Sequence, residues 1–296
     1  GRIAPADHRG VDRHIEQPYW QTVTRVPPPT PPEIERAGRV TADGVVSRRA
    51  GVAALKRYAP RYGLEIGEPT GTDWLRVDRL LEPDGPELTE LLKRDHDASD
   101  HVSAHANALS LMSFYAGRAP ATALLLWALE GRVLDIRPQN LWVKPHDGHG
   151  IAAVAIRSAD FLPGGLQALY DVVLTQHLLP LSAELHRRTR AGLRQLHGGV
   201  AAGCAMAFCA ATREQETVAP SFLLERWQTF VTKAPGGLSR LGEVTEAAGK
   251  LVYLRNTCCL YYTSVKGCGT VCGSCCLTSR ADRLTAYEAG KPILTV

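Results

Sequence analysis

The chain has 296 residues, of which 45% are hydrophobic and 22% are charged, and it carries a net charge of +4. These values are typical of a globular protein of one large or two modest domains, with a core that needs no disulfide support. The small positive charge forms no long basic run, which argues against a nucleic-acid-binding protein.

No stretch predicts a transmembrane helix, because the best candidate, Ala119 to Leu129, is too short and ends at Glu130. The first residues, GRIAPADHRG, lack the apolar centre of a signal peptide. We therefore expect a cytoplasmic protein whose exposed thiols stay reduced. Residues 1 to 35 are polar and rich in proline, which predicts an extended segment that lies on a surface.

Residues 36 to 160 are expected to form an N-terminal α+β region. The spacing of apolar residues predicts four helices there, at Ser47 to Tyr62, Glu87 to Lys93, Asp100 to Gly117 and Ala119 to Glu130. Asp84-Gly-Pro86 predicts a turn before the second helix, and Gly131 is expected to end the fourth. Thr72-Asp-Trp74 fits either a short strand or a short helix.

His101 and His105 lie four residues apart on one face of the third expected helix, where two imidazoles could hold a metal ion. The alternative is a solvated helix start, because Asp95, Asp97 and Asp100 surround them. No third ligand has a spacing that supports a metal site there.

One hairpin is clear in the middle of the chain. Leu141 to Lys144 and Ile151 to Ile156 predict two strands, joined by a turn at His146-Asp-Gly-His149. Phe161 to Gly165 is expected to be a loop.

Residues 161 to 254 are expected to form a helical region. Its predicted helices are Leu166 to Leu196, Val200 to Thr212 and Phe222 to Thr232. The candidate breaks are Pro180, His197-Gly-Gly199 and Pro235-Gly-Gly237. A run of basic residues ends the first of these helices, and it indicates either a solvated face or a ligand clamp. Its members are His186, Arg187, Arg188, Arg190 and Arg194.

Together these patterns predict a mainly helical α+β fold with a small central antiparallel sheet and a C-terminal helical bundle. A loop over residues 255 to 277 is expected to close the bundle. A polar tail over residues 278 to 296 follows.

The loop over residues 255 to 277 holds six of the eight cysteines, namely Cys258, Cys259, Cys268, Cys272, Cys275 and Cys276. The other two, Cys204 and Cys209, lie in an apolar alanine-rich run and are expected in the core. A disulfide framework is typical of small secreted domains, which this chain is not. The cysteine density therefore favours a metal site, since thiolates are ligands of zinc and of iron–sulfur clusters.

The spacing of the cysteines separates the two kinds of metal site. Cys272-Gly-Ser-Cys275 is a C-x-x-C chelate, which either metal accepts. The doublet Cys258-Cys259 is not a zinc-knuckle spacing, because adjacent side chains diverge unless the backbone bends or the target offers two irons. A two-iron cluster is favoured, with structural zinc and disulfides or free thiols as alternatives.

With these motifs the chain resembles the FhuF-like ferric-siderophore reductases, which carry a C-terminal [2Fe–2S] cluster on a cysteine doublet and a later C-G-x-C. R-x-x-C-C-L-Y-Y from Arg255 onward and Cys272-Gly-Ser-Cys275 match that pattern. The resemblance extends from about Leu80 to Leu277. It includes Pro138-Gln-Asn-Leu-Trp142.

The chain departs from the family at two places. Twelve residues separate Cys259 from Cys272, where the family has about ten, and Cys268 lies inside this gap. Relatives also tend to have W-G-N at His197-Gly198-Gly199, so any role of that Trp or Asn is not carried over.

The resemblance implies that the cluster ligands are Cys258, Cys259, Cys272 and Cys275, with Cys268 and Cys276 as alternative ligands. It implies an oxidoreductase of iron acquisition that passes one electron to a ferric siderophore, either hydroxamate or catecholate, and releases Fe(II). Candidate substrate contacts, for which packing is an equal alternative, are Arg255, Tyr261, Tyr262, Lys266, Asn140 and Trp142.

No nicotinamide or flavin fingerprint is present, and Gly267-x-Gly269 lacks the strand–helix unit that such a site needs. We therefore expect an external electron donor, either a ferredoxin or a flavoprotein reductase. Two other classes remain open. One is an iron–sulfur electron carrier for a protein partner, and the other is a zinc-stabilised interaction protein.

Overall fold

The computed structural model describes residues 48–56, 63–214, 218–264 and 271–290. The proline-rich segment, Ser47, Lys266 and Cys268 lie outside these ranges. The α-helices are α2 (Arg48–Lys56), α4 (Val77–Leu80), α5 (Pro86–Ala98), α6 (Ala104–Arg118), α7 (Ala121–Glu130), α8 (Gly165–Tyr170), α9 (Leu179–Thr189), α10 (Leu193–Glu214), α11 (Pro220–Thr232) and α12 (Arg280–Glu288). The strands are β1 (Leu64–Ile66), β2 (Leu75–Arg76), β3 (Val133–Leu134), β4 (Leu141–Pro145), β5 (Ile151–Ile156), β6 (Phe161–Leu162), β7 (Gly242–Ala247) and β8 (Lys250–Arg255).

The fold is therefore mainly helical with small sheets, as predicted. Strands β4 and β5 form the expected antiparallel hairpin, in which Leu141 pairs with Ile156 and Val143 with Val154. The short strand β1 runs parallel to β5, and β2 runs antiparallel to β4, which gives the sheet order β1-β5-β4-β2. The undecided Thr72-Asp-Trp74 stretch is the turn that leads into β2.

Three features differ from the sequence predictions. The last part of the expected helical region over residues 161 to 254 is not helical, because β7 and β8 form an antiparallel hairpin there. The start of the expected loop at Phe161 is strand β6, which pairs with β3. The polar tail contains helix α12, whose N-cap Ser279 accepts a hydrogen bond from the backbone N–H of Asp282.

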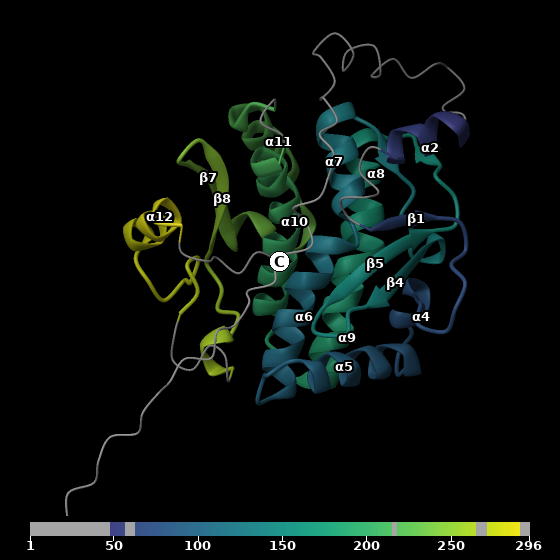
Figure 1. The fold of residues 1–296 in the computed structure, drawn as a ribbon, viewed down its shortest axis with the longest axis horizontal. Helices are drawn as coiled ribbons and strands as arrows, with labels where there is room; N and C mark the ends of the chain where they lie inside the picture. The colour runs from purple at the N-terminus through teal and green to yellow at the C-terminus, as the bar shows by residue number, and fades with distance from the viewer. Residues whose placement is uncertain (1–47, 57–62, 215–217, 265–270, 291–296) are drawn as a thin grey trace, which may run out of the picture.

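Helices α6 and α10 lie side by side at the centre of the molecule, between the β4–β5 sheet and the β7–β8 hairpin (Figure 1). Their contact is very close, because a side chain on Gly203 would place its Cβ 2.5 Å from the backbone nitrogen of Gly117. Only glycine allows this approach. Helix α10 continues through His197-Gly-Gly199, so the expected interruption there is wrong.

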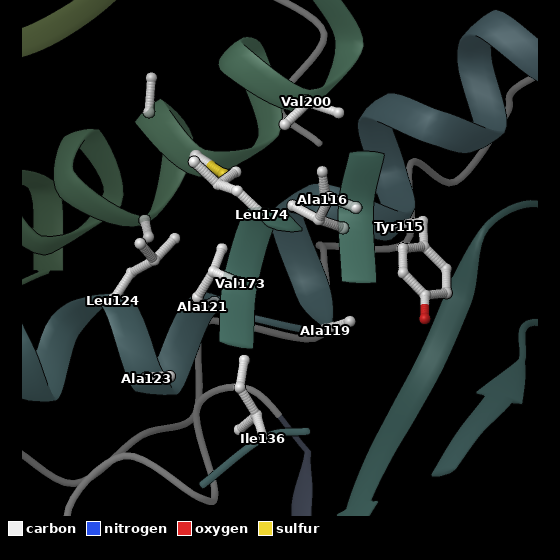
Figure 2. Close-up of a cluster of buried hydrophobic side chains, with 14 of the residues drawn as sticks. Tyr115, Ala116, Ala119, Ala121, Ala123, Leu124, Ile136, Val173, Leu174 and Val200 are labelled. Carbon is white, nitrogen blue, oxygen red and sulfur yellow. The ribbon is translucent and has the colours of Figure 1, made fainter. Parts of the chain in front are cut away.

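The core lies where α6, α7, α10 and the π-helical segment η3 (Asp171–Leu178) meet. Figure 2 shows side chains from these elements turned toward one another, among them Ala116, Leu124, Leu174 and Val200. Helix α7 is buried on every side, as its uniformly apolar sequence predicts. It ends at Gly131, which has the left-handed φ of 68° expected for a helix stop.

The segment η3 replaces the middle of the long helix expected from Leu166. Within it, Nε2 of His177 lies 2.7 Å from the hydroxyl of Tyr115, and both side chains are fully buried. Burial lowers the pKa of His177 to about 3, so the ring is neutral at pH 7.

Helix α6 begins later than expected. Its N-cap is Ser103, whose hydroxyl accepts a hydrogen bond from the backbone N–H of Ala106. His101 therefore precedes the helix and is buried, whereas His105 is exposed inside it. The prediction that the two imidazoles share one helix face is wrong.

Two of the basic residues at the end of α9 pair with a buried carboxylate. Arg187 and Arg188 both donate to the buried carboxylate of Glu184, at 2.6 and 2.7 Å. Arg188 also donates to the carbonyl oxygen of Gly85 at 2.9 Å, and the backbone N–H of Asp84 reaches Glu184 at 3.2 Å. This arginine–glutamate cluster ties α9 to the turn before α5, which makes a ligand clamp unnecessary as an explanation.

No helix among the described residues is long and apolar enough to cross a membrane.

Candidate metal centre

Two chain segments bring five of the clustered cysteines together. Cys258 and Cys259 follow strand β8, and Cys272, Cys275 and Cys276 precede helix α12. The β7–β8 hairpin packs on α10 and on α12, so both segments start from fixed elements. In Figure 1 they lie on the side of α6 and α10 that faces away from the four-stranded sheet.

The thiols of Cys259 and Cys272 are hydrogen-bonded to each other across the two segments. This contact lowers the pKa of Cys259 to about 5, with the nearby guanidinium of Arg255 acting in the same direction. It raises the pKa of Cys272, which keeps the shared proton. The shared proton therefore favours ionisation of Cys259 over Cys272, and Cys275 and Cys276 lie close enough to interact with Cys259 electrostatically.

Backbone N–H groups face two of the sulfurs. The N–H of Leu260 lies 3.4 Å from Sγ of Cys258, and the N–H of Leu277 lies 3.5 Å from Sγ of Cys275. The N–H of Cys275 bonds the carbonyl of Cys272 at 2.9 Å, which closes the C-x-x-C turn. Hydrogen bonds of this kind stabilise thiolates and adjust the reduction potential of clusters that thiolates bind.

A glycine of α10 sets the position of the first segment. Gly198 lies directly against the side chain of Thr257, so that any Cβ at this position would overlap its hydroxyl. Thr257 is buried and immediately precedes the doublet Cys258-Cys259. The absence of a side chain at Gly198 therefore allows the cysteine segment to lie on the central helix.

Arg255, at the end of β8, is a buried cation beside the thiols and has only 8% of its surface exposed. Its Nη1 makes one long hydrogen bond, of 3.4 Å, to the hydroxyl of Ser113 on α6. Its Nε and Nη2 have no partner among the described residues. Nη1 of Arg283 holds the Arg255 carbonyl at 2.7 Å, which fixes the backbone there.

A small, partly open cavity, of about 40 Å³, lies between α6, β8 and the cysteine segments. Its lining includes Arg255, Tyr253, Cys259, Cys272, Tyr261 and Ser110. The hydroxyl of Tyr253 is also buried without a partner among the described residues. The cavity thus places the unpartnered donors of Arg255 and Tyr253 beside the thiols of Cys259 and Cys272.

These residues fit a thiolate-bound cluster in their chemistry. Soft sulfur donors come from two segments, and a buried cation with free N–H groups faces them, as a cluster with net negative charge requires. Among the described residues, no three His, Cys, Asp or Glu side chains are arranged around one ion. A two-iron cluster, if bound, would be held by cysteines of both segments, among which Cys259 and Cys272 already contact each other.

The other candidate residues divide into two groups. Tyr261 and Tyr262 form the short 3₁₀ helix η5 (Tyr261–Thr263) after the doublet and are half-buried. Trp142 belongs to β4, and Asn140 ends the 3₁₀ helix η2 (Pro138–Asn140) just before that strand, so both lie on the far side of α6 and α10. The amide of Asn140 donates to the backbone carbonyls of Asp135 and Ser158, at 2.5 and 3.0 Å, which is a structural role.

Cys204 and Cys209 lie in α10 and are fully buried, as expected for core residues. Burial raises the pKa of each thiol to about 12, which makes both unreactive. They are therefore natural controls for the clustered cysteines.

Sequence reasoning missed the cavity residues on α6, Ser110 and Ser113, and Tyr253 on β8. Helical periodicity showed only that Ser110 and Ser113 share a face, and no signal linked that face to a segment 145 residues away. Neither the models of known protein families nor the curated proteins give a match to this chain.

Proposed function

We propose that the chain is a [2Fe–2S] protein, with Cys258, Cys259, Cys272 and Cys275 as ligands, that reduces ferric siderophores. The reaction transfers one electron from an external ferredoxin or flavoprotein to Fe(III), and the chelate then releases Fe(II). The observation that carries the proposal is the convergence of two cysteine segments on a buried, largely unpartnered arginine.

The cluster, when bound, would supply a one-electron carrier. The residues of the chain define its surroundings. Arg255 places a positive charge in a site shielded from water, which favours the state with one more negative charge. The N–H groups of Leu260 and Leu277 stabilise charge on sulfur in the same sense. Together they raise the reduction potential, so that the site accepts an electron from a low-potential donor.

A ferric siderophore is much larger than the cavity of about 40 Å³, so the chelate would bind outside it. The cysteine segment offers exposed apolar side chains on both sides of its thiols, Val271 at 38% and Leu277 at 62% exposure. Tyr262 is half-buried nearby in sequence. A chelate or a donor protein that covers this surface would approach the thiols through a short protein layer.

Electron carriage to a protein partner is the second candidate. The exposed Leu277 and Val271 favour it equally, because apolar side chains beside a redox site also suit protein docking. The two functions differ in the final acceptor of the electron, which is the Fe(III) of a chelate in the first and a protein partner in the second.

The first test is the composition of protein purified without oxygen. Two irons and two sulfides per chain, with the visible absorption of a [2Fe–2S] cluster, are expected. Zinc without sulfide would replace the proposal with the zinc-stabilised interaction protein.

The second test uses protein that has been reduced and freed of excess reductant. Ferric hydroxamate or ferric catecholate is added, and reoxidation of the protein is followed together with trapping of Fe(II). The matched control is the Ga(III) form of each chelate, which has the same charge and size but cannot accept the electron. If neither ferric chelate reoxidises the protein, electron carriage becomes the better assignment.

A further inference from the structure

A second group of reactive side chains lies at the edge of the same cavity, and the proposed redox function does not use it. Ser110 on α6 places its hydroxyl 2.8 Å from Nε2 of His149. Nδ1 of His149 lies 2.9 Å from Oδ1 of Asp95 on α5. His149 belongs to the turn between β4 and β5, and these elements meet beside α6 (Figure 1).

The carboxylate of Asp95 is held firmly. The side chain is buried, and its Oδ1 accepts a hydrogen bond of 2.7 Å from the backbone N–H of Gly150. Its Oδ2 has no hydrogen-bond partner among the described residues. A buried carboxylate with an unsatisfied oxygen is costly unless a positive charge forms beside it, and His149 is the group placed to carry that charge.

We propose that Ser110, His149 and Asp95 form a nucleophilic acyl-transfer site that hydrolyses carboxylic esters with a small acyl group. The order hydroxyl, imidazole, carboxylate is the one that activates a serine. With the proton on Nδ1, Nε2 of His149 accepts the hydroxyl proton, and Asp95 stabilises the resulting imidazolium. The N–H bond at Nδ1 of His149 does not point at Oδ1 of Asp95, so the two atoms are close but not hydrogen-bonded. Such misalignment is common for catalytic contacts before a substrate binds.

The reaction is balanced without a cofactor. Oγ of Ser110 forms a bond to the carbonyl carbon while its proton moves to Nε2 of His149. The C–O bond of the ester breaks, and the leaving alcohol takes that proton. Water then attacks the acyl-serine with His149 as base, which releases the acid and restores the hydroxyl.

Charge that develops on the carbonyl oxygen needs a donor. The backbone N–H groups around Ser110 are engaged within α6, so the donor has to be a side chain. Ser113, one helical turn further, is bonded to Nη1 of Arg255. The Nε and Nη2 of Arg255 have no partner among the described residues, and Ser110, Ser113 and Arg255 all line the cavity, so the guanidinium is the donor assigned to the carbonyl oxygen.

The cavity also limits the substrate. About 40 Å³ accommodates a few atoms at most, so only a small acyl group enters, with the alcohol part outside. A purely structural role would tie the β4–β5 turn to α5, and the bond from Gly150 to Asp95 already does so. Such a structural role does not require the hydroxyl of Ser110 to lie 2.8 Å from the imidazole of His149.

The test is labelling of the full chain, as purified, by a fluorophosphonate probe that reacts with activated serines, followed by mapping of the labelled peptide. Label on Ser110 is expected, with complete loss in Ser110→Ala. His149→Gln is expected to slow labelling at least about 10²-fold, the usual contribution of a general base. Because Ser110 is half-buried and His149 lies in a turn, both variants should keep the urea midpoint of the wild type.

The matched control is His105→Gln. His105 is exposed on the same helix, with its ring 3.4 Å from the hydroxyl of Ser103, and it lies away from the cavity. Labelling should be unchanged in this variant. No label in the wild type, or label that persists in Ser110→Ala, would overturn the proposal and leave the three residues as a structural tie. Neither result affects the iron and sulfide content that tests the redox proposal.

Discussion

The molecule buries arginine side chains in two different ways. Arg188, at the end of α9, has a side chain only 11% exposed and donates to Glu184, Gly85 and Thr89 at 2.7 to 2.9 Å. Arg255, at the end of β8, is equally buried but makes a single long bond to a neutral hydroxyl. The charge of Arg188 is compensated by Glu184 within the fold, whereas no carboxylate among the described residues bonds to Arg255.

This difference separates a structural cation, Arg188, from one that we propose to face a bound anion, Arg255. An ion pair inside the fold contributes to the free energy of unfolding, and removing one partner leaves the other buried and unpaired. A buried cation without an anion costs stability, and it persists where a ligand benefits from it.

The largest effect is expected when the anion proposed for Arg255 is removed. Cys272→Ser and Cys275→Ser should each abolish the bound iron and sulfide, because a hydroxyl is a poor ligand for soft iron sites. Iron, sulfide and visible absorption of anaerobically purified protein measure this. Cys204→Ser and Cys209→Ser, in the core of α10, should leave the cluster intact. Absorbance retained in Cys272→Ser would show that Cys268 is the ligand in its place.

The next largest effect is expected when Arg188, the structural cation, is replaced. Arg188→Met should lower the free energy of unfolding by about 1–3 kcal/mol, because it removes the hydrogen bonds to Glu184, Gly85 and Thr89 while Arg187 still pairs with Glu184. Urea unfolding of the metal-free protein measures this. Arg190→Met, at an exposed position of the same run, should change it by less than about 0.5 kcal/mol. If Arg188→Met left the free energy of unfolding unchanged, the contrast between Arg188 and Arg255 would not hold.

The same cluster predicts a pH dependence of stability. The pKa of Glu184 is lowered to about 2, chiefly by the hydrogen bonds from Arg187. A carboxyl whose pKa is lower in the folded state stabilises the fold above its ordinary pKa of 4.5. This contribution, roughly 3 kcal/mol, is lost as the pH falls toward 2. Unfolding measured from pH 6 to pH 2 should show this slope, and Glu184→Gln should reduce it.

The smallest effect on stability is expected at Arg255. Arg255→Met should change the free energy of unfolding of the metal-free protein by less than about 1 kcal/mol, because the lost hydrogen bond is offset by relief of an uncompensated buried charge. The cluster, by contrast, should bind less tightly and have a lower midpoint potential. Arg255→Lys, which keeps the charge, should restore most of both. Destabilisation as large as that of Arg188→Met would indicate a partner for Arg255 within the protein.

Much of the fold follows from local patterns, and the failures have identifiable causes. The β4–β5 hairpin was predictable because its apolar strands flank a turn sequence. The His197-Gly-Gly199 stretch looked like a break because glycine lowers helix propensity. In the folded protein tertiary contacts decide instead, since Gly198 accommodates Thr257 and Gly203 accommodates α6.

Of the site residues too, some could be predicted from the sequence and others could not. The cysteines stood out because their density is unusual anywhere in a sequence. Arg255 was visible only as a neighbour in the motif, since its burial and missing partners depend on α6 packing beside β8. Ser110, His149 and Asp95 lie on three elements with no common spacing, so nothing along the chain relates them.

The π-helical segment η3 has a consequence for how this protein could have arisen. A π turn holds about one residue more than an α turn, so η3 can be regarded as an α-helix that accepted an insertion. The wide turns absorb the extra residue, so the helix after η3 keeps the facing that it would have without the insertion. Deleting one residue from η3 should therefore restore an ordinary helix and leave the contacts of α9 in place.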